Sequence, residues 1–313
     1  MNPYITSATL VILSILVVDI PCLGQEKTKA KSKSGEVVFH INHGKLQGEY
    51  KSFYKGGQLK ATGVFKSNCR TGKWIIYNET GQKKVERDYS SPLHFSQILP
   101  VKKDDAYLQS VFQMNPDGYV EYPKIDEKNI LWSKRIWRTI DKKDNPLLFN
   151  DEYLYKTLYS GVIQKQIQAY APRNDEFADS LLELHDELKS IQVTAFKIKE
   201  EYYFDQSLNM MLSQIIGICP VSNGTDLFWL YYPNIQPYLA QMAVVTNLEG
   251  VEVKSLDQLF EQRMFASTIY QESNTFDLSL AEMHGADKVE EQSLIIELDL
   301  IETEHDFWLK SNN

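Results

Sequence analysis

The spacing of apolar residues changes along the chain, and these changes predict which segments are helices. Between residues 126 and 167, apolar side chains recur every three or four positions, which is typical of amphipathic helices. We predict one helix over 126–141, with Asp126 as its N-cap and Pro146 beyond its end, and a second over 150–167. The apolar face of the first helix would be Trp132, Ile136 and Ile140, and that of the second Leu154, Leu158, Val162 and Ile167.

The pattern becomes that of strands between residues 193 and 233. Segments 193–205, 208–221 and 226–233 are rich in β-branched and aromatic residues and are bounded by turn residues. Asn223-Gly224, between the last two segments, is the strongest short-range signal for a tight hairpin. Pro220 and Pro233 would lie at strand ends, where a missing N–H group costs little. We expect these strands to form the centre of a sheet.

Helical spacing returns after residue 255. Ser255 is a suitable N-cap for a helix over 255–273, and residues 279–310 predict one or two acidic helices at the end of the chain. The order of helices, then strands, then helices predicts an α+β domain.

A different pattern, an internal repeat, occupies the region before residue 90. Residues 48–60 match residues 72–84 at a shift of 24 positions. We predict short β-hairpins that stack on one another, with aromatic residues along one face and glycines at the turns. The matched pairs are Gly48 and Gly72, Tyr50 and Trp74, Phe53 and Tyr77, Gly57 and Gly81, and Lys60 and Lys84. The pattern resembles MORN-type repeats, which implies a binding or spacer module.

The first residues have the pattern of an export signal. The apolar run at 8–18 is too short to span a bilayer comfortably and suits the apolar region of a signal peptide. Cys22 and Gly24 are small residues, placed as a cut after Gly24 requires. An acylated lipoprotein at Cys22 is the alternative, but Asp19 and Pro21 do not suit it. We expect export and cleavage.

These patterns together predict the organisation of the chain. They give a signal peptide at 1–24, a Lys-rich solvated linker at 25–37, the MORN-like repeat module at 38–90, an irregular connector at 91–124 and a second domain at 125–308. The alternative role for the linker is electrostatic adhesion to an acidic neighbour or to a membrane surface. No transmembrane segment is expected in the mature protein.

Composition narrows the class of protein. With 43% hydrophobic and 24% charged residues, the chain can build a sizeable core. Its net charge of -9 and pI near 5.3 argue against nucleic acid as a main partner. After cleavage, Cys69 and Cys219 remain, and we expect two buried free thiols rather than a disulfide.

The sequence offers little for catalysis or metal binding. It contains no nucleophile elbow, zinc-protease motif, P-loop or dinucleotide fingerprint. His40 and His43 are three positions apart, so on a strand they would point to opposite faces. Carboxylate pairs such as Glu200 and Glu201 are adjacent and do not converge on one site. We expect no enzyme activity, no metal and no cofactor.

Six segments of the second domain occur in a specific order and spacing. They are 130–149, 169–177, 215–221, 228–240, 256–274 and 304–308. Together they resemble the GldN/PorN family, periplasmic proteins of the type IX secretion and gliding-motility machinery of Bacteroidota. The resemblance covers about 125–308 and implies a GldN-like domain with central antiparallel strands and flanking helices.

The resemblance also implies a function. Such a protein would be a non-enzymatic subunit of an oligomeric assembly, exported to the periplasm and associated with the outer membrane. Its partners would be an outer-membrane lipoprotein and other envelope proteins of the same machinery. The repeat module at 38–90 departs from the family pattern, so a paralogue in a related envelope assembly stays open.

Aromatic residues are the candidates for contact with a partner. Their ordinary explanation is core packing, and the alternative is that some anchor an interface. Pro233 and Pro237 would end a strand and leave the tyrosines beside them near the surface. The candidate partner-contact residues are Trp132, Trp137, Tyr232 and Tyr238.

The sequence is compatible with three functions. The first is an envelope assembly subunit that acts through protein–protein contacts. The second is a periplasmic binding module in which the MORN-like repeats hold a cell-wall glycan or a toxin-like partner. A hydrolase ranks last, because no catalytic constellation supports it.

Overall fold

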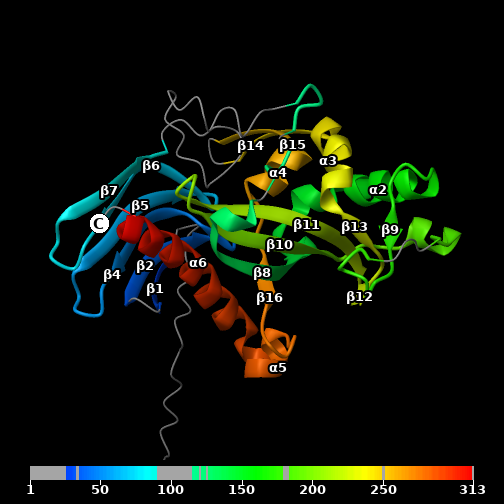
Figure 1. Ribbon diagram of the computed structural model, residues 1–313. Coiled ribbons are helices and arrows are strands. Elements are labelled where there is room, and N and C mark those ends of the chain that lie inside the picture. Colours follow the sequence, from blue (N-terminus) through cyan, green and yellow to red (C-terminus); the bar gives the residue numbers. More distant parts are fainter. Residues whose placement is uncertain are drawn as a thin grey trace, which may run out of the picture.

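Two seven-stranded antiparallel sheets, both contacted by the C-terminal helix, make up most of the structure (Figure 1). The computed structural model describes residues 26–32, 35–89, 115–119, 121–124, 126–178, 183–248 and 251–311. The predicted signal peptide at 1–24 and most of the predicted connector at 91–124 lie outside these described residues. The combination of antiparallel strands and helices confirms the α+β prediction.

The first sheet is built from the first seven strands. Its order is β1-β2-β4-β5-β6-β7, and the short β3 pairs with β2. The strands are β1 (Glu26–Lys31), β2 (Glu36–Asn42), β3 (Lys45–Leu46), β4 (Gly48–Phe53), β5 (Leu59–Lys66), β6 (Cys69–Tyr77) and β7 (Lys83–Asp88).

The internal repeat corresponds to two equivalent hairpins, β4–β5 and β6–β7. Gly57 donates its N–H to the carbonyl of Tyr54 (2.8 Å), and Gly81 donates to that of Asn78 (2.9 Å). Both glycines are left-handed, with φ of 83° and 80°, a conformation that a side chain disfavours. The hairpins lie side by side in one continuous sheet, and their aromatic face packs on the C-terminal helix instead of on another hairpin.

The prediction of a solvated linker at 25–37 is wrong. Glu26–Lys31 forms β1, which pairs with β2 from Glu26↔Ile41 to Lys31↔Glu36. In this strand, exposed Lys29 and Lys31 alternate with partly buried residues. This alternation is typical of a strand, but the lysine-rich composition made the segment look like a solvated linker. Lysines are also common on edge strands, where they discourage pairing with other chains.

The second sheet has the order β16-β8-β10-β11-β13-β9, and β12 pairs with β11. Its strands are β8 (Ile130–Asp141), β9 (Ala169–Tyr170), β10 (Ala195–Asp205), β11 (Met210–Ser222), β12 (Thr225–Asp226), β13 (Trp229–Tyr231) and β16 (Thr268–Glu272). β10 and β11 confirm two predicted strands. Ser222 pairs with Thr225, so Asn223-Gly224 forms the predicted two-residue hairpin turn, with φ of 47° and 81°.

The predicted helix over 126–141 is wrong, because this segment forms β8. Trp132, Ile136 and Ile140 are spaced by four positions, and an even spacing places residues on one face of a strand as well as near one face of a helix. Asp126 is an N-cap, as predicted, but it caps a single 3-10 turn and not a long helix. The Asp126 side chain accepts from the N–H of Lys128 in a short 3-10 helix, which leads into the strand.

Helices pack on one face of the second sheet, and two more helices end the chain. The helices of the described residues are α2 (Tyr153–Ile163), α3 (Tyr232–Gln241), α4 (Leu256–Glu261), α5 (Leu280–His284) and α6 (Val289–Ser311). The described residues also form the 3-10 segments η1 (Glu127–Asn129), η2 (Lys142–Asp144), η3 (Pro146–Glu152), η4 (Asp186–Ser190) and η5 (Ala286–Lys288). A separate hairpin joins β14 (Ala243–Leu248) to β15 (Val251–Ser255). α2, α5 and α6 confirm predicted helices.

The helix predicted over 255–273 is only partly correct. Ser255 is its N-cap, as predicted, and accepts a hydrogen bond from the N–H of Gln258. The helix ends at Glu261, and Arg263 takes a left-handed conformation with φ of 51°. The chain then continues into β16, at the edge of the second sheet.

α6 supplies side chains to both sheets. Leu298 is fully buried with Val37, Phe39, Tyr50 and other residues of the first sheet, forming one core cluster. Ile296, Leu300 and Trp308 share another cluster with Ile136 and Met211 of the second sheet and Ile76 of the first. The repeat module is therefore not an independent unit, because its core is completed by the C-terminal helix.

Buried charges on α6 reinforce this packing. The side chain of Lys60 in β5 is fully buried. Its ammonium lies 2.7 Å from the carboxylate of Glu302 and 2.6 Å from that of Asp306. Tyr50 of β4 donates its hydroxyl to Glu302 at 2.8 Å. These contacts satisfy the ammonium and one carboxylate together, which is the condition for burying an ion pair.

Glu304 binds both sheets at once. Its Oε2 accepts from the guanidinium of Arg70 in β6, and its Oε1 accepts from the backbone N–H of Met211 in β11 at 3.2 Å. The Arg70 guanidinium also lies over the rings of Trp74 and Trp308, at 5.1 and 5.6 Å from their centres. A single buried carboxylate thus fixes α6 relative to both sheets.

Among the described residues, none of the helices combines the length and apolar character needed to cross a membrane.

Replacing Glu304 by Gln should therefore destabilise the whole fold. The change leaves the Arg70 guanidinium buried without its anion, which costs about 3–5 kcal/mol of unfolding free energy. Urea unfolding measures this loss as a lower midpoint with an unchanged slope. Glu291→Gln, on the exposed end of α6, is the matched control and should change stability by less than about 0.5 kcal/mol. A loss below about 1 kcal/mol for Glu304→Gln would contradict this role.

Candidate functional site

A row of side chains crosses one face of the second sheet. Trp137 of β8 pairs with Lys199 of β10, Lys199 with Gly217 of β11, and Gly217 with Tyr231 of β13. Side chains directly opposite one another on neighbouring strands lie on the same face. These residues are distant in sequence, and only the pairing register brings them together.

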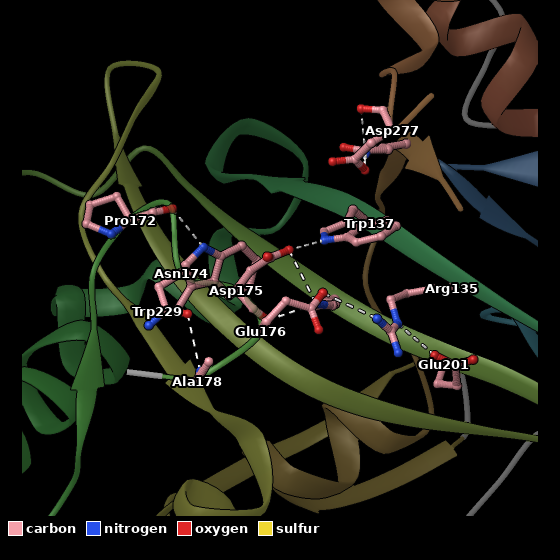
Figure 2. Close-up of polar contacts among 12 residues, drawn as sticks. Arg135, Trp137, Pro172, Asn174, Asp175, Glu176, Ala178, Glu201, Trp229 and Asp277 are labelled. Atoms are coloured by element: carbon pink, nitrogen blue, oxygen red, sulfur yellow. Dashed lines mark hydrogen bonds and ion pairs between the residues drawn. The ribbon is translucent and has the colours of Figure 1, made fainter. Parts of the chain in front are cut away.

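Residues 171–178, which we call the strap, cross this face (Figure 2). Beneath and beside them lies a cluster that contains Trp137, Tyr170, Cys219 and Trp229, with Phe177 and Tyr270 partly buried against it. The Trp229 ring N–H donates to the carbonyl of Pro172 at 3.1 Å, which fixes one end of the strap. α2, α3 and α4 contribute to a separate core cluster, together with Ile140, Ile198 and Ile218 of the sheet.

Phe177 of the strap lies in an aromatic slot. Its ring is edge-on to Tyr170 at 5.1 Å and to Tyr231 at 5.4 Å, measured between ring centres. Gly217 forms the floor of the slot, since a Cβ at that position would come within 2.4 Å of the Phe177 ring. Phe177 itself has φ of 56°, an uncommon conformation for a bulky residue. The slot thus holds an aromatic ring at the expense of local strain.

A buried lysine holds the acidic part of the strap. The Lys199 ammonium, on a side chain only 1% exposed, donates to the carbonyl of Asp175 at 2.8 Å and to the carboxylate of Glu176 at 2.6 Å. The Trp137 ring N–H donates to the Asp175 carboxylate at 2.7 Å, as Figure 2 shows. The hydrogen bond from Lys199 lowers the pKa of Glu176, so this carboxylate stays ionised near neutral pH.

Charges continue from the strap onto the open sheet. Arg135 of β8 lies 3.3 Å from Glu176 and 2.8 Å from Glu201 of β10. A polar hollow of about 570 Å³ lies beside them, lined by these three residues, by Trp137 and by β16 and the residues that follow it. Donors on the sheet therefore hold the carboxylates of the strap, and the aromatic slot holds its Phe177 ring.

The two cysteines of the described chain are poorly suited to act as nucleophiles. Cys219 and Cys69 are both free thiols, as predicted, although only Cys219 is fully buried and Cys69 is partly buried. Desolvation by the surrounding protein raises the pKa of each to about 12. A protonated thiol is a poor nucleophile. Within the part of the chain that the structure describes, no group of three or more His, Cys, Asp or Glu residues could hold a metal.

The four candidate contact residues have different positions. Trp137 lies in the strapped site and is 8% exposed. Trp132 is partly buried on the side of the sheet that faces α6. Tyr238 is partly buried on α3 and packs against the core. A role in partner contact stays a prediction for these three.

The surface position predicted for Tyr232 is wrong. Tyr232 is fully buried, and it begins α3 instead of ending a strand. Pro233 lies in the first turn of this helix, where a missing N–H group is tolerated as it is at a strand end. Pro237 lies inside the same helix. Lys199, Gly217, Tyr231 and the strap were not predicted as site residues, because their convergence depends on strand register.

Tyr232 instead belongs to a buried acidic cluster. Its hydroxyl donates to Asp257 of α4 at 3.0 Å, and Tyr122 donates to Glu261, one turn further along. Burial raises the pKa of Asp257 to about 6. Burial, with added repulsion from Asp257, raises that of Glu261 to about 8. Tyr122 also accepts from the N–H of Ile215 at 2.9 Å, which connects α4 to the second sheet.

A family comparison agrees with the architecture. The family model described as gliding motility associated protein GldN matches residues 125–309. The match covers the whole second sheet and nearly all of α6, but none of the first sheet. No curated protein matches the chain significantly.

Replacing Lys199 by Met should release the strap. Charge-assisted hydrogen bonds contribute about 1.5–3 kcal/mol, so the open population should rise by about 10- to 100-fold. Trypsin cleavage after the exposed Arg173 measures this population, because proteolysis requires local opening. The matched control is Lys197→Met on the same strand, since Lys197 pairs with Asp226 and not with the strap. Equal cleavage rates in the two variants would show that Lys199 does not hold the strap.

Glu261→Gln should change how stability depends on pH. The folded pKa of about 8 lies above the unfolded value of about 4.3, so the protonated acid stabilises the fold at low pH. This contribution decreases as pH rises from about 4.3 and is lost once the pH passes about 8. The native chain should therefore lose on the order of 2 kcal/mol between pH 5 and 8, and the variant less than half of that. Chemical unfolding at several pH values tests this, with the exposed Glu187→Gln as control. Parallel curves for native chain and variant would contradict the assignment.

Proposed function

The chain belongs to the GldN family of gliding-motility-associated proteins, and we propose that it is a non-enzymatic assembly subunit that acts through protein–protein contacts. The family supplies components of the gliding-motility and type IX secretion machinery, which is a multi-protein complex. The proposal adds that this chain is a scaffold within that complex. The observation that carries it is the strapped face of the second sheet.

Segments of the family-like sequence converge on that face. Trp137 comes from the segment 130–149, the strap from 169–177, Gly217 from 215–221 and Tyr231 from 228–240. Aromatic anchors surrounded by polar groups are typical of the energetic centres of protein interfaces. Tyr231 is 37% exposed at the edge of the Phe177 slot, so it is open to a partner.

The polar groups of the site support a positioning role. Lys199, Arg135 and the strap carboxylates are paired with one another as ion pairs and hydrogen bonds. Such pairs fix backbone position and select a partner of complementary charge. They leave no general base beside a nucleophile, which acyl or glycosyl transfer would require.

The proposed location is the periplasm, at the outer membrane. It rests on the export signal predicted at 1–24 and on the role that the family resemblance implies. The proposed partners are an outer-membrane lipoprotein and other envelope proteins of the same machinery, within an oligomeric assembly.

The alternative function, a binding module based on the repeats, has less support. Tyr50 and Trp74 lie on the aromatic face of the repeats, and both are fully buried. Tyr50 donates to Glu302 of α6, so this face contacts the C-terminal helix and is closed to a glycan or a toxin-like partner.

Partner capture tests the proposal. Tyr231→Ser should reduce recovery of an envelope partner by about tenfold or more, because central interface aromatics contribute 2 kcal/mol or more. Tyr153→Ser is the matched control, since Tyr153 is 55% exposed on α2 and lies outside the strapped face. Circular dichroism would verify that both variants fold. Undiminished capture by Tyr231→Ser, or an equal loss in the control, would refute a role for this face.

A further inference from the structure

One buried cation of the second sheet takes all its polar partners from the strap. Among the described residues, the hydrogen bonds and ion pairs of Lys199 go to Asp175 and Glu176. Its ammonium lies 2.6 Å from the carboxylate of Glu176 and 3.4 Å from that of Asp175, and its side chain is 1% exposed. A buried ammonium without an anion is strongly destabilising. The strap can therefore leave this face at low cost only if another carboxylate takes its place.

The other donors of this face are positioned by the sheet itself. Figure 2 shows Trp137 and Arg135, both on β8, beside the acidic residues of the strap. Trp137 donates its ring N–H to the Asp175 carboxylate at 2.7 Å. Arg135 also lies 2.8 Å from Glu201 of β10, so it keeps an anion whether or not Glu176 is present. Because strand pairing fixes these donors, the face would offer them equally to a separate chain.

The slot beside the donors is shaped for an aromatic ring. Tyr170 and Tyr231 present their rings to its occupant, and the missing side chain of Gly217 leaves room for that occupant. Edge-on packing against two rings favours another aromatic side chain. Tyr231 is 37% exposed, so the slot is open to solvent at this edge. A ring from outside the chain could therefore enter where Phe177 now lies.

The strap occupies this face under strain. The backbone of Phe177 has φ of 56°, a conformation that is costly for a bulky residue. The ion pair between Glu176 and Arg135 joins side chains that are 64% and 36% exposed, and exposed pairs contribute little. What favours the strap is its covalent connection, which gives it a high effective concentration at the site. A separate segment could present the same groups on an unstrained backbone.

We propose that the strap is an internal ligand, and that a partner docks by replacing it with an extended segment of the same chemistry. That segment carries one or two carboxylates followed directly by an aromatic residue, in the order of Asp175, Glu176 and Phe177. Its carboxylate would take the place of Glu176 on Lys199, and its ring would enter the slot. This inference rests on the proposed function as a contact subunit, and it adds the chemistry of the partner and the exchange that admits it.

The exchange would make binding selective in two ways. A segment without a carboxylate would leave the Lys199 ammonium buried without an anion. A segment without an aromatic ring would leave the slot unfilled and forfeit the edge-on ring contacts that Phe177 makes. Either segment loses to the strap, which supplies both groups and is always present. Rejection of the wrong segment is thus built into the free chain.

Displacement of the strap can be measured with a peptide. The probe is Asn-Asp-Glu-Phe-Ala, the sequence of residues 174–178, with both ends blocked. It contains no site for trypsin, whereas the strap contains the exposed Arg173. Added to the native chain, it should speed cleavage after Arg173 toward the rate of Lys199→Met, because a displaced strap is open to the protease. Control peptides with both acids changed to amides, or with Phe changed to Ala, should leave the native rate unchanged.

A weakened strap should leave the site open to the same peptide. The variant Glu176→Gln/Phe177→Ser should bind the labelled peptide about tenfold or more tightly than the native chain, measured by fluorescence anisotropy, because the strap competes less. The matched control is Glu187→Gln/Phe276→Ser, two exposed positions outside the strapped face, which should bind like the native chain. Circular dichroism would verify that the variants fold.

Further substitutions in the weakened-strap variant locate the peptide. Adding Lys199→Met should abolish binding, because the peptide carboxylate loses its buried cation. Adding Gly217→Ala should also weaken binding, since a Cβ at this position overlaps the ring in the slot. Equal binding with and without Lys199→Met would place the peptide elsewhere and overturn the inference.

Two other results would overturn it, and both differ from failure of the proposed function. They are a weakened-strap variant that does not bind the peptide, and a native chain whose cleavage after Arg173 is unaffected by the peptide. Capture of an envelope partner together with either result would leave the assembly role standing without this exchange. Peptide binding as predicted, with no envelope partner captured, would support the docking site and count against the assembly role alone.

Discussion

The buried carboxylate of Glu304 is the constraint on which the arrangement of the molecule depends. It accepts a charge-assisted hydrogen bond from Arg70 in the first sheet and a backbone hydrogen bond from Met211 in the second. A carboxylate without partners would be costly inside the protein, so both sheets must be in place when α6 is buried. Glu302, two residues before Glu304 on α6, forms a second buried ion pair with Lys60 of the first sheet. The N-terminal repeats are consequently part of one cooperative core.

This constraint determines which surfaces are free to act. α6 covers the aromatic face of the first sheet, and α2, α3 and α4 belong to the core on one side of the second. Among the described residues, the strapped face lies open, and there Lys199 and Gly217 hold the acidic and aromatic groups of the strap. Its exposed Tyr231 and its paired charges are features typical of protein recognition. The proposed role as an assembly subunit rests on this face.

Local signals in the sequence predicted local structure, and long-range pairing was hidden from them. The Asn223-Gly224 turn and the Ser255 cap depend on neighbouring residues, and both were predicted correctly. The segment 126–141 was assigned to the wrong element, because a spacing of four fits a strand face as well as a helix face. The strapped site could not be predicted residue by residue, since the pairing of Trp137 with Lys199 is a matter of register. The family resemblance identified the segments but not how they meet.

The central claim is that the strapped face contacts an envelope protein in the cell. Photo-crosslinking from a reactive amino acid at position 231, with position 153 on α2 as reference, measures this contact directly in intact cells. The account predicts a defined adduct from position 231, containing a protein of the same secretion or motility machinery, and no such adduct from position 153. Absence of any adduct from position 231, or identical adducts from both positions, would contradict it.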